Sequence, residues 1–213
     1  MNQCRHVAVN DSTFRRNPRR DFYWKLPNDV VDLGLLGAVS GKLFVVYTVL
    51  RTFVWRTDDC KYPERSEQFA RGRLVAYLKP RQLAALAGVK DAEPHTIELT
   101  DLGWVKSLDY DYPNGAYWLG NKSSADDDVG VLFFDQALLG LRAKLGDYWE
   151  RGRSPGAQVG RVRTLLERVR KANIDGKPNP LHVAAAQHES KQPHGRRVFV
   201  YLESRRSLCP GRD

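Results

Sequence analysis

The chain has 213 residues, of which 42% are hydrophobic, so it can bury a core as one domain with appendages or as two small domains. Its formal net charge of +9 favours an acidic partner, and we expect nucleic acid ahead of an anionic membrane surface or an acidic protein. The cysteines, Cys4, Cys60 and Cys209, show no metal-binding or disulfide spacing, and no stretch of ~18 apolar residues occurs. These features argue against a zinc site, a secreted disulfide-rich protein and a membrane-spanning protein, and the expected location is the cytoplasm.

The first segment, residues 1–21, is basic and poor in apolar residues, so it cannot bury enough surface to fold alone. We therefore predict a mobile arm. Its arginines either contact phosphates or simply keep the terminus soluble. The candidates for phosphate contact are Arg15, Arg16, Arg19 and Arg20.

The first long helix is predicted to follow Ser40, a candidate N-cap, because apolar residues recur after it at helical intervals. These residues are Leu43, Val46, Tyr47, Leu50 and Val54. Their β-branched content also permits a strand, but a run of ~15 residues favours a helix. A polar loop over 57–73 and a short strand over 74–78 are expected next.

Residues 80–103 contain two predicted short helices around a tight turn. Pro80 suits the first position of a helix, and Gly88 comes where a left-handed residue must end it. The second helix is expected to start at an N-cap, Asp91 or Glu93, and to stop at Gly103. The predicted apolar faces are Leu83, Leu86 and Ala87 in the first helix and Ile97, Leu99 and Leu102 in the second.

A hairpin is predicted directly after the second helix. Residues 104–110 and 116–119 are aromatic and β-branched, and Asn114-Gly115 between them is a strong signal for a tight turn. The result is a two-stranded wing, with 74–78 as a third strand beside it.

The pattern QLAALAGV…IELTDLGWV followed by a hairpin resembles the winged helix-turn-helix domains of bacterial regulators and of plasmid or phage replication and partition proteins. The resemblance implies a mainly α fold with a small β wing (α+β) over 22–120. A basic helical C-terminal region is expected after it. It also implies that the second helix enters the major groove of DNA and that the wing contacts the backbone. The residues that match these roles are Lys79, Arg81, Lys90, His95, Thr96 and Lys106.

Two basic amphipathic helices are predicted over 129–173, after an acidic linker at 121–128. Asp135 is a candidate N-cap for the first helix, residues 154–156 end it, and the second helix covers 158–173. Their apolar faces are expected to pack together or to pair with a second copy of the chain in a homodimer.

The basic face of these helices carries much of the charge of the chain. Nine basic residues against three acidic ones lie between residues 142 and 171. Arginine stripes on amphipathic helices indicate phosphate-facing surfaces. The candidates are Arg161, Arg163, Arg168, Arg170 and Lys171.

The last segment, residues 174–213, is predicted to be a partly disordered tail with a candidate edge strand at 196–203. Its histidines, His182, His188 and His194, are six residues apart, which matches no metal-ligand spacing, so they are expected to be surface residues. No motif for phosphate-loop, dinucleotide, serine-hydrolase or zinc-enzyme chemistry occurs. We therefore predict no catalytic residue, no cofactor and no metal site.

Two functions follow from these patterns. In the first, the winged helix binds duplex DNA in replication initiation, partition or transcriptional control of a mobile element, and the basic arm and helices hold phosphates. In the second, the winged helix docks a partner protein in a larger nucleoprotein complex, and the C-terminal helices hold DNA or RNA. The second is favoured by the acidity of residues 79–103, which carry three basic side chains against four carboxylates.

Overall fold

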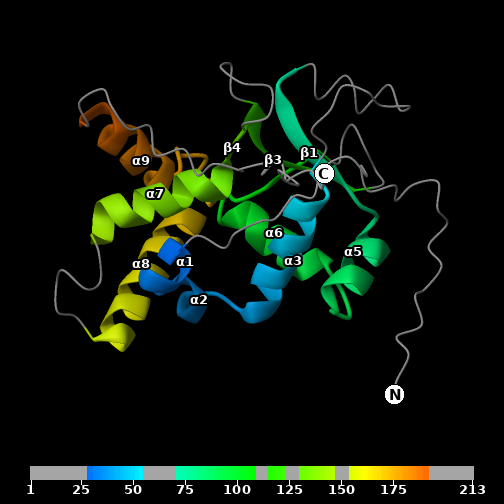
Figure 1. Ribbon diagram of the computed structural model, residues 1–213, viewed down its shortest axis with the longest axis horizontal. Coiled ribbons are helices and arrows are strands. Elements are labelled where there is room, and N and C mark those ends of the chain that lie inside the picture. Colours follow the sequence, from blue (N-terminus) through cyan, green and yellow to red (C-terminus); the bar gives the residue numbers. More distant parts are fainter. Residues whose placement is uncertain (1–27, 55–70, 109–114, 123–129, 147–153, 192–213) are drawn as a thin grey trace, which may run out of the picture.

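The computed structural model describes residues 28–54, 71–108, 115–122, 130–146 and 154–191 (Figure 1). These residues form a mostly helical α+β structure with a small antiparallel sheet. The elements are α1 (Asn28–Asp32), α2 (Leu35–Ala38), α3 (Gly41–Thr52), β1 (Arg73–Tyr77), α5 (Pro80–Ala87), α6 (Glu93–Asp101), β2 (Lys106–Ser107), β3 (Ala116–Lys122), β4 (Gly130–Leu132), α7 (Phe133–Leu145), α8 (Pro155–Ile174) and α9 (Pro180–Lys191). The predicted arm over 1–21, most of the linker and the candidate strand at 196–203 lie outside the described residues.

Helix α3 begins where the sequence predicts it. The Ser40 hydroxyl accepts a hydrogen bond from the backbone N–H of Leu43 at 3.1 Å, which satisfies a donor that the first turn leaves unpaired. All five residues of the predicted apolar face are buried, but Val54 lies beyond the end of α3, where it forms an isolated β-bridge with Ala76. The helical prediction is therefore confirmed, and the alternative of a strand is wrong.

Helices α5 and α6 also form where the sequence predicts two short helices around a tight turn. Gly88 adopts a left-handed φ of 65°, which lets the N–H of Val89 reach the carbonyl of Ala84 at 3.0 Å. At the start of α6, the N-cap is Ala92, so the prediction of Asp91 or Glu93 as N-cap is wrong. The carboxylate of Asp91 nevertheless accepts a hydrogen bond from the N–H of Glu93, the first helical residue, at 3.0 Å.

Two residues of the predicted apolar faces are not in the core. Leu86 is 47% exposed and Ile97 is 55% exposed. Leu83 and Ala84 face the core from α5, which turns Leu86 to the side of the helix. Ile97 lies two residues from the buried Leu99, so it projects from nearly the opposite side of α6. The prediction that these two side chains are buried is wrong.

The sheet has the order β1-β3-β2, with β4 also paired to β3. Strand β1 pairs antiparallel with β3 along residues 116–121, which confirms the predicted third strand. The opposite edge of β3 is shared, because β2 pairs with its first half and β4 with its second half. Strand β4 leads directly into α7, so the C-terminal helices are attached to the sheet.

The C-terminal region differs from its prediction in three places. Asp135 is not an N-cap, because α7 begins two residues earlier, at Phe133. Ser154 and Pro155 do not close α7; they start α8, whose N-cap is Ser154. Helix α9 occupies part of the segment that was predicted as a tail. It packs tightly on α7, since a Cβ atom at Gly140 would lie 2.0 Å from the carbonyl oxygen of Leu181.

One hydrophobic core joins the described N-terminal and C-terminal elements. Tyr47 of α3, Trp104 before β2 and Phe134 of α7 pack against one another, with ring centres 4.6 to 5.8 Å apart. Beside them, the buried guanidinium of Arg51 contacts the carboxylate of Asp135 at 3.1 Å, across α3 and α7. In Figure 1, α7, α8 and α9 lie on the left and α5 on the right, with α3 and α6 between them. The core therefore fixes α8 relative to α6.

Candidate nucleic-acid interface

Helix α8 is positioned by an apolar face that enters the core. Val162, Leu166 and Val169 are fully buried, and they recur every three or four residues. This spacing leaves the predicted basic residues on the two flanks and on the outer side of the helix. The structure divides these residues into two groups.

The first group consists of Arg163, which is exposed, and Arg170, which is half-buried; their side chains contact α2 and α6. Arg163 donates a hydrogen bond to the carbonyl oxygen of Gly37 at 2.8 Å. Arg170 contacts the carboxylate of Glu98 on α6 at 2.7 Å, and it also contacts Glu167. These two arginines were predicted to contact phosphates, but their described contacts are with the protein itself.

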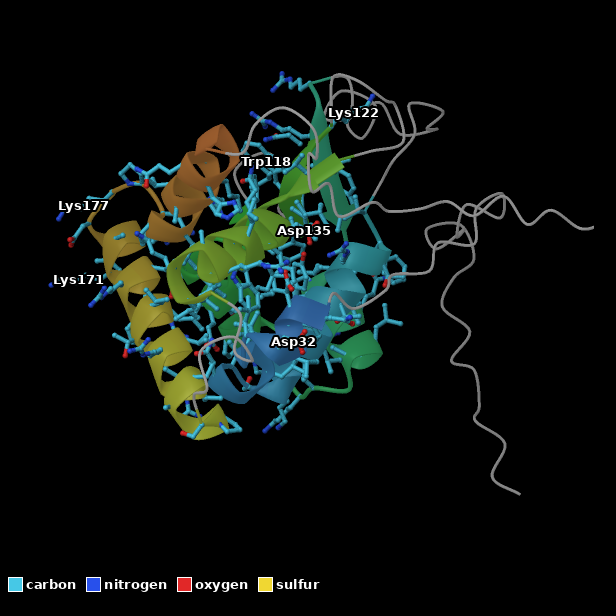
Figure 2. All side chains as sticks on the ribbon, turned by 60° about the vertical axis from the view of Figure 1, so that its left-hand side comes forward. Asp32, Trp118, Lys122, Asp135, Lys171 and Lys177 are labelled. Atoms are coloured by element: carbon cyan, nitrogen blue, oxygen red, sulfur yellow. The ribbon has the colours of Figure 1, made fainter. Side chains whose placement is uncertain are left out.

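The second group is exposed to solvent and consists of Arg161, Arg168 and Lys171, which we call the α8 stripe. These residues are seven and three positions apart, so they follow one side of the helix over ~15 Å. Among the described residues, no hydrogen bond or ion pair engages their side chains. Figure 2 shows Lys171 pointing away from the molecule at its left-hand edge. The stripe is therefore a row of available positive charge.

Helices α6 and α8 are held together at their C-terminal ends. The side chain of Asn173 donates to the carbonyl oxygen of Thr100, and that of Asn179 donates to the carbonyl oxygen of Leu102, each at 3.4 Å. The Asn173 contact and the pair between Glu98 and Arg170 line α8 up beside α6, and Asn179 joins the segment between α8 and α9 to the end of α6. Sequence reasoning missed them because they join residues more than 70 positions apart.

The predicted contacts on α5 and α6 are only partly available. Lys79, Arg81 and Lys90 are exposed. His95 and Thr96 are half-buried, and the Thr96 hydroxyl donates to the carbonyl oxygen of Glu93 at 2.9 Å.

The side of α6 that faces solvent carries no basic residue and is partly apolar. It carries Glu93, Pro94 and Ile97, all exposed. This surface lacks the side chains that usually contact phosphates or read bases.

Lys106 of β2, which was predicted as a wing contact, lies in a cluster of rings and cations that the sequence did not predict. Its ammonium nitrogen lies 4.7 Å from the ring centre of Trp118 and 5.0 Å from that of Phe133. The guanidinium carbon of Arg73 is also 4.7 Å from the Trp118 ring centre. The imidazole of His182 stacks on Phe133 and contacts its carbonyl oxygen at 3.1 Å. We call these five residues the Trp118 cluster.

The histidine of this cluster is electrostatically perturbed. Burial lowers the pKa of His182 below its ordinary value of 6.5, and the positive charge of Lys106 lowers it further. The hydrogen bond with the Phe133 carbonyl opposes these effects. His182 was predicted as a loose surface residue, and that prediction is wrong because α9 places it against α7.

The predicted phosphate contacts of the N-terminal arm lie outside the described residues. Arg15, Arg16, Arg19 and Arg20 precede the first described residue. Within the described ranges, no group of three His, Cys, Asp or Glu side chains could hold a metal ion. None of the described helices is long and apolar enough to cross a membrane. The chain matches no protein-family model, no curated protein and no solved structure.

Proposed function

We propose that this protein binds nucleic acid, with the α8 stripe as its main phosphate-contacting surface. The observation that carries the proposal is the division of the cations on α8. Arg163 and Arg170 are engaged by the protein, whereas Arg161, Arg168 and Lys171 form an exposed row in which the described residues offer no partner. A row of unpaired cations on a rigid helix is suited to a regular row of phosphates.

The salt dependence of binding by the α8 stripe follows from counterion release. Each phosphate that is neutralised adds about 0.9 to the slope of log affinity against log salt concentration on duplex DNA. Three contacts from the stripe would therefore contribute a slope of about 2.7. Between 50 and 200 mM salt, this part alone corresponds to roughly a 40-fold change in affinity.

Duplex DNA is the ligand that we propose, and a winged helix is the arrangement that we propose for residues 41–122. The order α3, β1, α5, α6, β2, β3 and the left-handed Gly88 between α5 and α6 support this arrangement. In it, α6 would lie in the major groove and the stripe on α8 would hold the flanking backbone. Replication initiation, partition and transcriptional control of a mobile element are the processes in which we propose such a protein to act.

A matched pair of substitutions on one helix tests the proposal. Arg168→Gln removes an available cation, whereas Arg163→Gln removes an engaged one, and each lowers the net charge by one. We expect Arg168→Gln to reduce the salt slope for a duplex oligonucleotide by about 0.9 and Arg163→Gln to leave it nearly unchanged. Equal losses from both variants would show that overall charge, and not the stripe, holds the ligand.

The exposed side of α6 favours a second arrangement. Ile97 is 55% exposed next to Glu93 and Pro94, which suits an apolar and basic protein surface better than a phosphate backbone. In this arrangement, α6 docks a partner protein and the stripe alone holds DNA or RNA. The two arrangements make different predictions for the cations around α5, because only the first places Lys79, Arg81 and Lys90 against duplex DNA.

A further inference from the structure

Helix α9 is held in the described structure mainly by its packing against α7. Its connection to α8 is the short segment 175–179, in which Gly176 adopts a left-handed φ of 66°. In Figure 1, α9 lies beside α7 at the upper left of the molecule. The side chains that α9 buries are few and mostly small, namely Leu181, Ala184 and Ala185. The apolar contact that keeps α9 in place is therefore limited, and a polar contact can change its position.

Such a polar contact joins α9 to the start of α7. Nε2 of His182 lies 3.1 Å from the carbonyl oxygen of Phe133, and the imidazole stacks on the Phe133 ring with ring centres 6.2 Å apart. A carbonyl oxygen only accepts hydrogen bonds, so Nε2 carries the hydrogen in the neutral ring. A second proton must therefore bind at Nδ1. This proton adds a charge without breaking the existing hydrogen bond, so its effect depends on how well the surroundings tolerate that charge.

The surroundings of His182 disfavour a positive charge. The ring is half-buried, and the ammonium nitrogen of Lys106 on β2 lies 5.0 Å from the centre of the Phe133 ring on which His182 stacks. Burial lowers the pKa of His182, and the charge of Lys106 lowers it further. The carboxylate of Asp135 on α7 does not offset these effects, because it is engaged by Arg51.

Other charged side chains on the neighbouring elements are paired or directed elsewhere. They are Arg73 of β1, which lies over the Trp118 ring, Lys171 of α8, which points away from the molecule in Figure 2, Arg142 of α7, which pairs with Asp29, and Lys177, which pairs with Asp175. On α9 itself, His188 lies six residues beyond His182. Among the described charges, Lys106 is therefore the one that acts on His182.

We propose that α9 is a pH-sensitive element, which docks on α7 while His182 is neutral and detaches when His182 takes up a proton. A charged ring recovers its hydration only when α9 leaves α7. Undocking restores the ordinary pKa of 6.5, so docking is fully favoured above pH 6.5 and weakens as the pH falls through the lower pKa of the docked state. In acid, each unit by which docking lowers the pKa reduces the ratio of docked to undocked protein about tenfold. This behaviour does not depend on a nucleic-acid ligand.

Amide hydrogen exchange measures the docking of α9 separately from global unfolding. An isolated helix of 12 residues is marginal in water, so the amides of α9 should lose their protection once it detaches. We expect the protection factors of the amides of residues 184–190 to fall between about pH 7.5 and about pH 5, while those of α3 stay high.

Variants of two residues separate the charge of His182 from other effects of pH. His182→Gln keeps a side-chain N–H but cannot take up a proton, so its α9 should stay protected in acid. His188→Gln is the control on the same helix, and its α9 should lose as much protection as that of the unmodified protein. Lys106→Gln should lose less protection than Lys106→Arg, because only the first variant removes the charge that opposes protonation.

An NMR titration of the His182 ring in the unmodified protein supplies a second measurement that needs no variant. The protection of α9 should fall over the pH range in which this ring takes up its proton. The proposal is overturned if α9 stays protected at about pH 5, if α3 loses protection in parallel, or if the loss occurs outside the titration range of His182. It is also overturned if His182→Gln shows the same loss as the unmodified protein.

Discussion

Helices α6 and α8 were both predicted to face nucleic acid, and the structure gives them different surfaces. Helix α8 presents Arg161, Arg168 and Lys171 to solvent, whereas α6 presents Glu93 and Ile97. Between the two helices, Glu98 and Arg170 neutralise each other at 2.7 Å. The charge of a segment therefore does not tell which of its charges are available, because packing removes some of them in pairs.

Part of the acidity of α6 is directed at α8 and not at solvent, since Glu98 contacts Arg170. The basic surface of α8 is correspondingly smaller than its composition suggests. Removing residues 129–213 would not isolate either helix, because Phe134 and Leu181 belong to the common core. Point substitutions are the appropriate way to test the two surfaces.

The largest effect on stability is expected from breaking the ion pair between Arg51 of α3 and Asp135 of α7. This pair lies in the core that holds α6 and α8 together. Asp135→Ala leaves the guanidinium of Arg51 buried without this carboxylate, and we expect a loss of about 3–5 kcal/mol in the free energy of unfolding. Chemical denaturation measures the change. The double variant Arg51→Met/Asp135→Leu should recover much of the loss, and an Asp135→Ala protein as stable as the unmodified one would contradict this role.

A smaller effect is expected where α9 meets α7. Gly140→Ala places a methyl group against the carbonyl of Leu181, so α9 must shift, and we expect a loss of about 1–3 kcal/mol. Gly160→Ala is the control, because it lies in α8 with open space around its Cβ position. That substitution should stabilise the protein by about 0.5–1 kcal/mol. Thermal or chemical unfolding of both variants should show opposite signs.

The pair between α6 and α8 is partly exposed, so its contribution should be modest. Glu98→Gln should lower stability by about 0.5–1 kcal/mol, because both side chains are more than a quarter exposed and solvent screens the pair. Glu93→Gln is the control, because the carboxylate of Glu93 lies on the same helix and has no described ion pair. This variant should change stability by less than about 0.5 kcal/mol. Indistinguishable variants would show that the pair does not hold α6 to α8.

The smallest effect concerns pH. The pKa of His182 is lowered in the folded protein, so the unfolded chain binds a proton more readily. The contribution of His182 to stability is therefore fully present above pH 6.5 and is lost as the pH falls through the lower pKa of the folded state. We expect the difference in melting temperature between pH 7.5 and pH 5.5 to shrink in His182→Gln. An unchanged difference would mean that His182 does not titrate as described.

Local signals in the sequence predicted the local structure well. Ser40, Pro80 and Gly88 mark helix ends through capping and backbone conformation, and these depend on neighbouring residues only. Helix α9 was missed although its signal was present. Asn179 accepts a hydrogen bond from the N–H of Leu181 at 2.9 Å, Pro180 follows at the first helical position, and small apolar residues recur after it. The surrounding Gly, Pro and His residues obscured this pattern.

The candidate sites depend on contacts that a single sequence does not reveal. The pairing of Glu98 with Arg170 joins residues 72 positions apart, and Arg73 meets Trp118 only through the register of β1 and β3. Five cations on α8 were predicted to face phosphates. The sequence contains no signal that Arg163 instead contacts Gly37. Periodicity shows which side of a helix is apolar, but the identity of its neighbours comes from the fold.

The most direct test of the α8 stripe compares two triple variants in a salt titration of duplex binding. One variant is Arg161→Gln/Arg168→Gln/Lys171→Gln, and the other is Lys79→Gln/Arg81→Gln/Lys90→Gln, so each loses three positive charges. We predict that the stripe variant loses about 2.7 of the salt slope and that the α5–α6 variant loses clearly less. A larger loss from the α5–α6 variant, or equal losses from both, would contradict the assignment of the phosphate surface to α8.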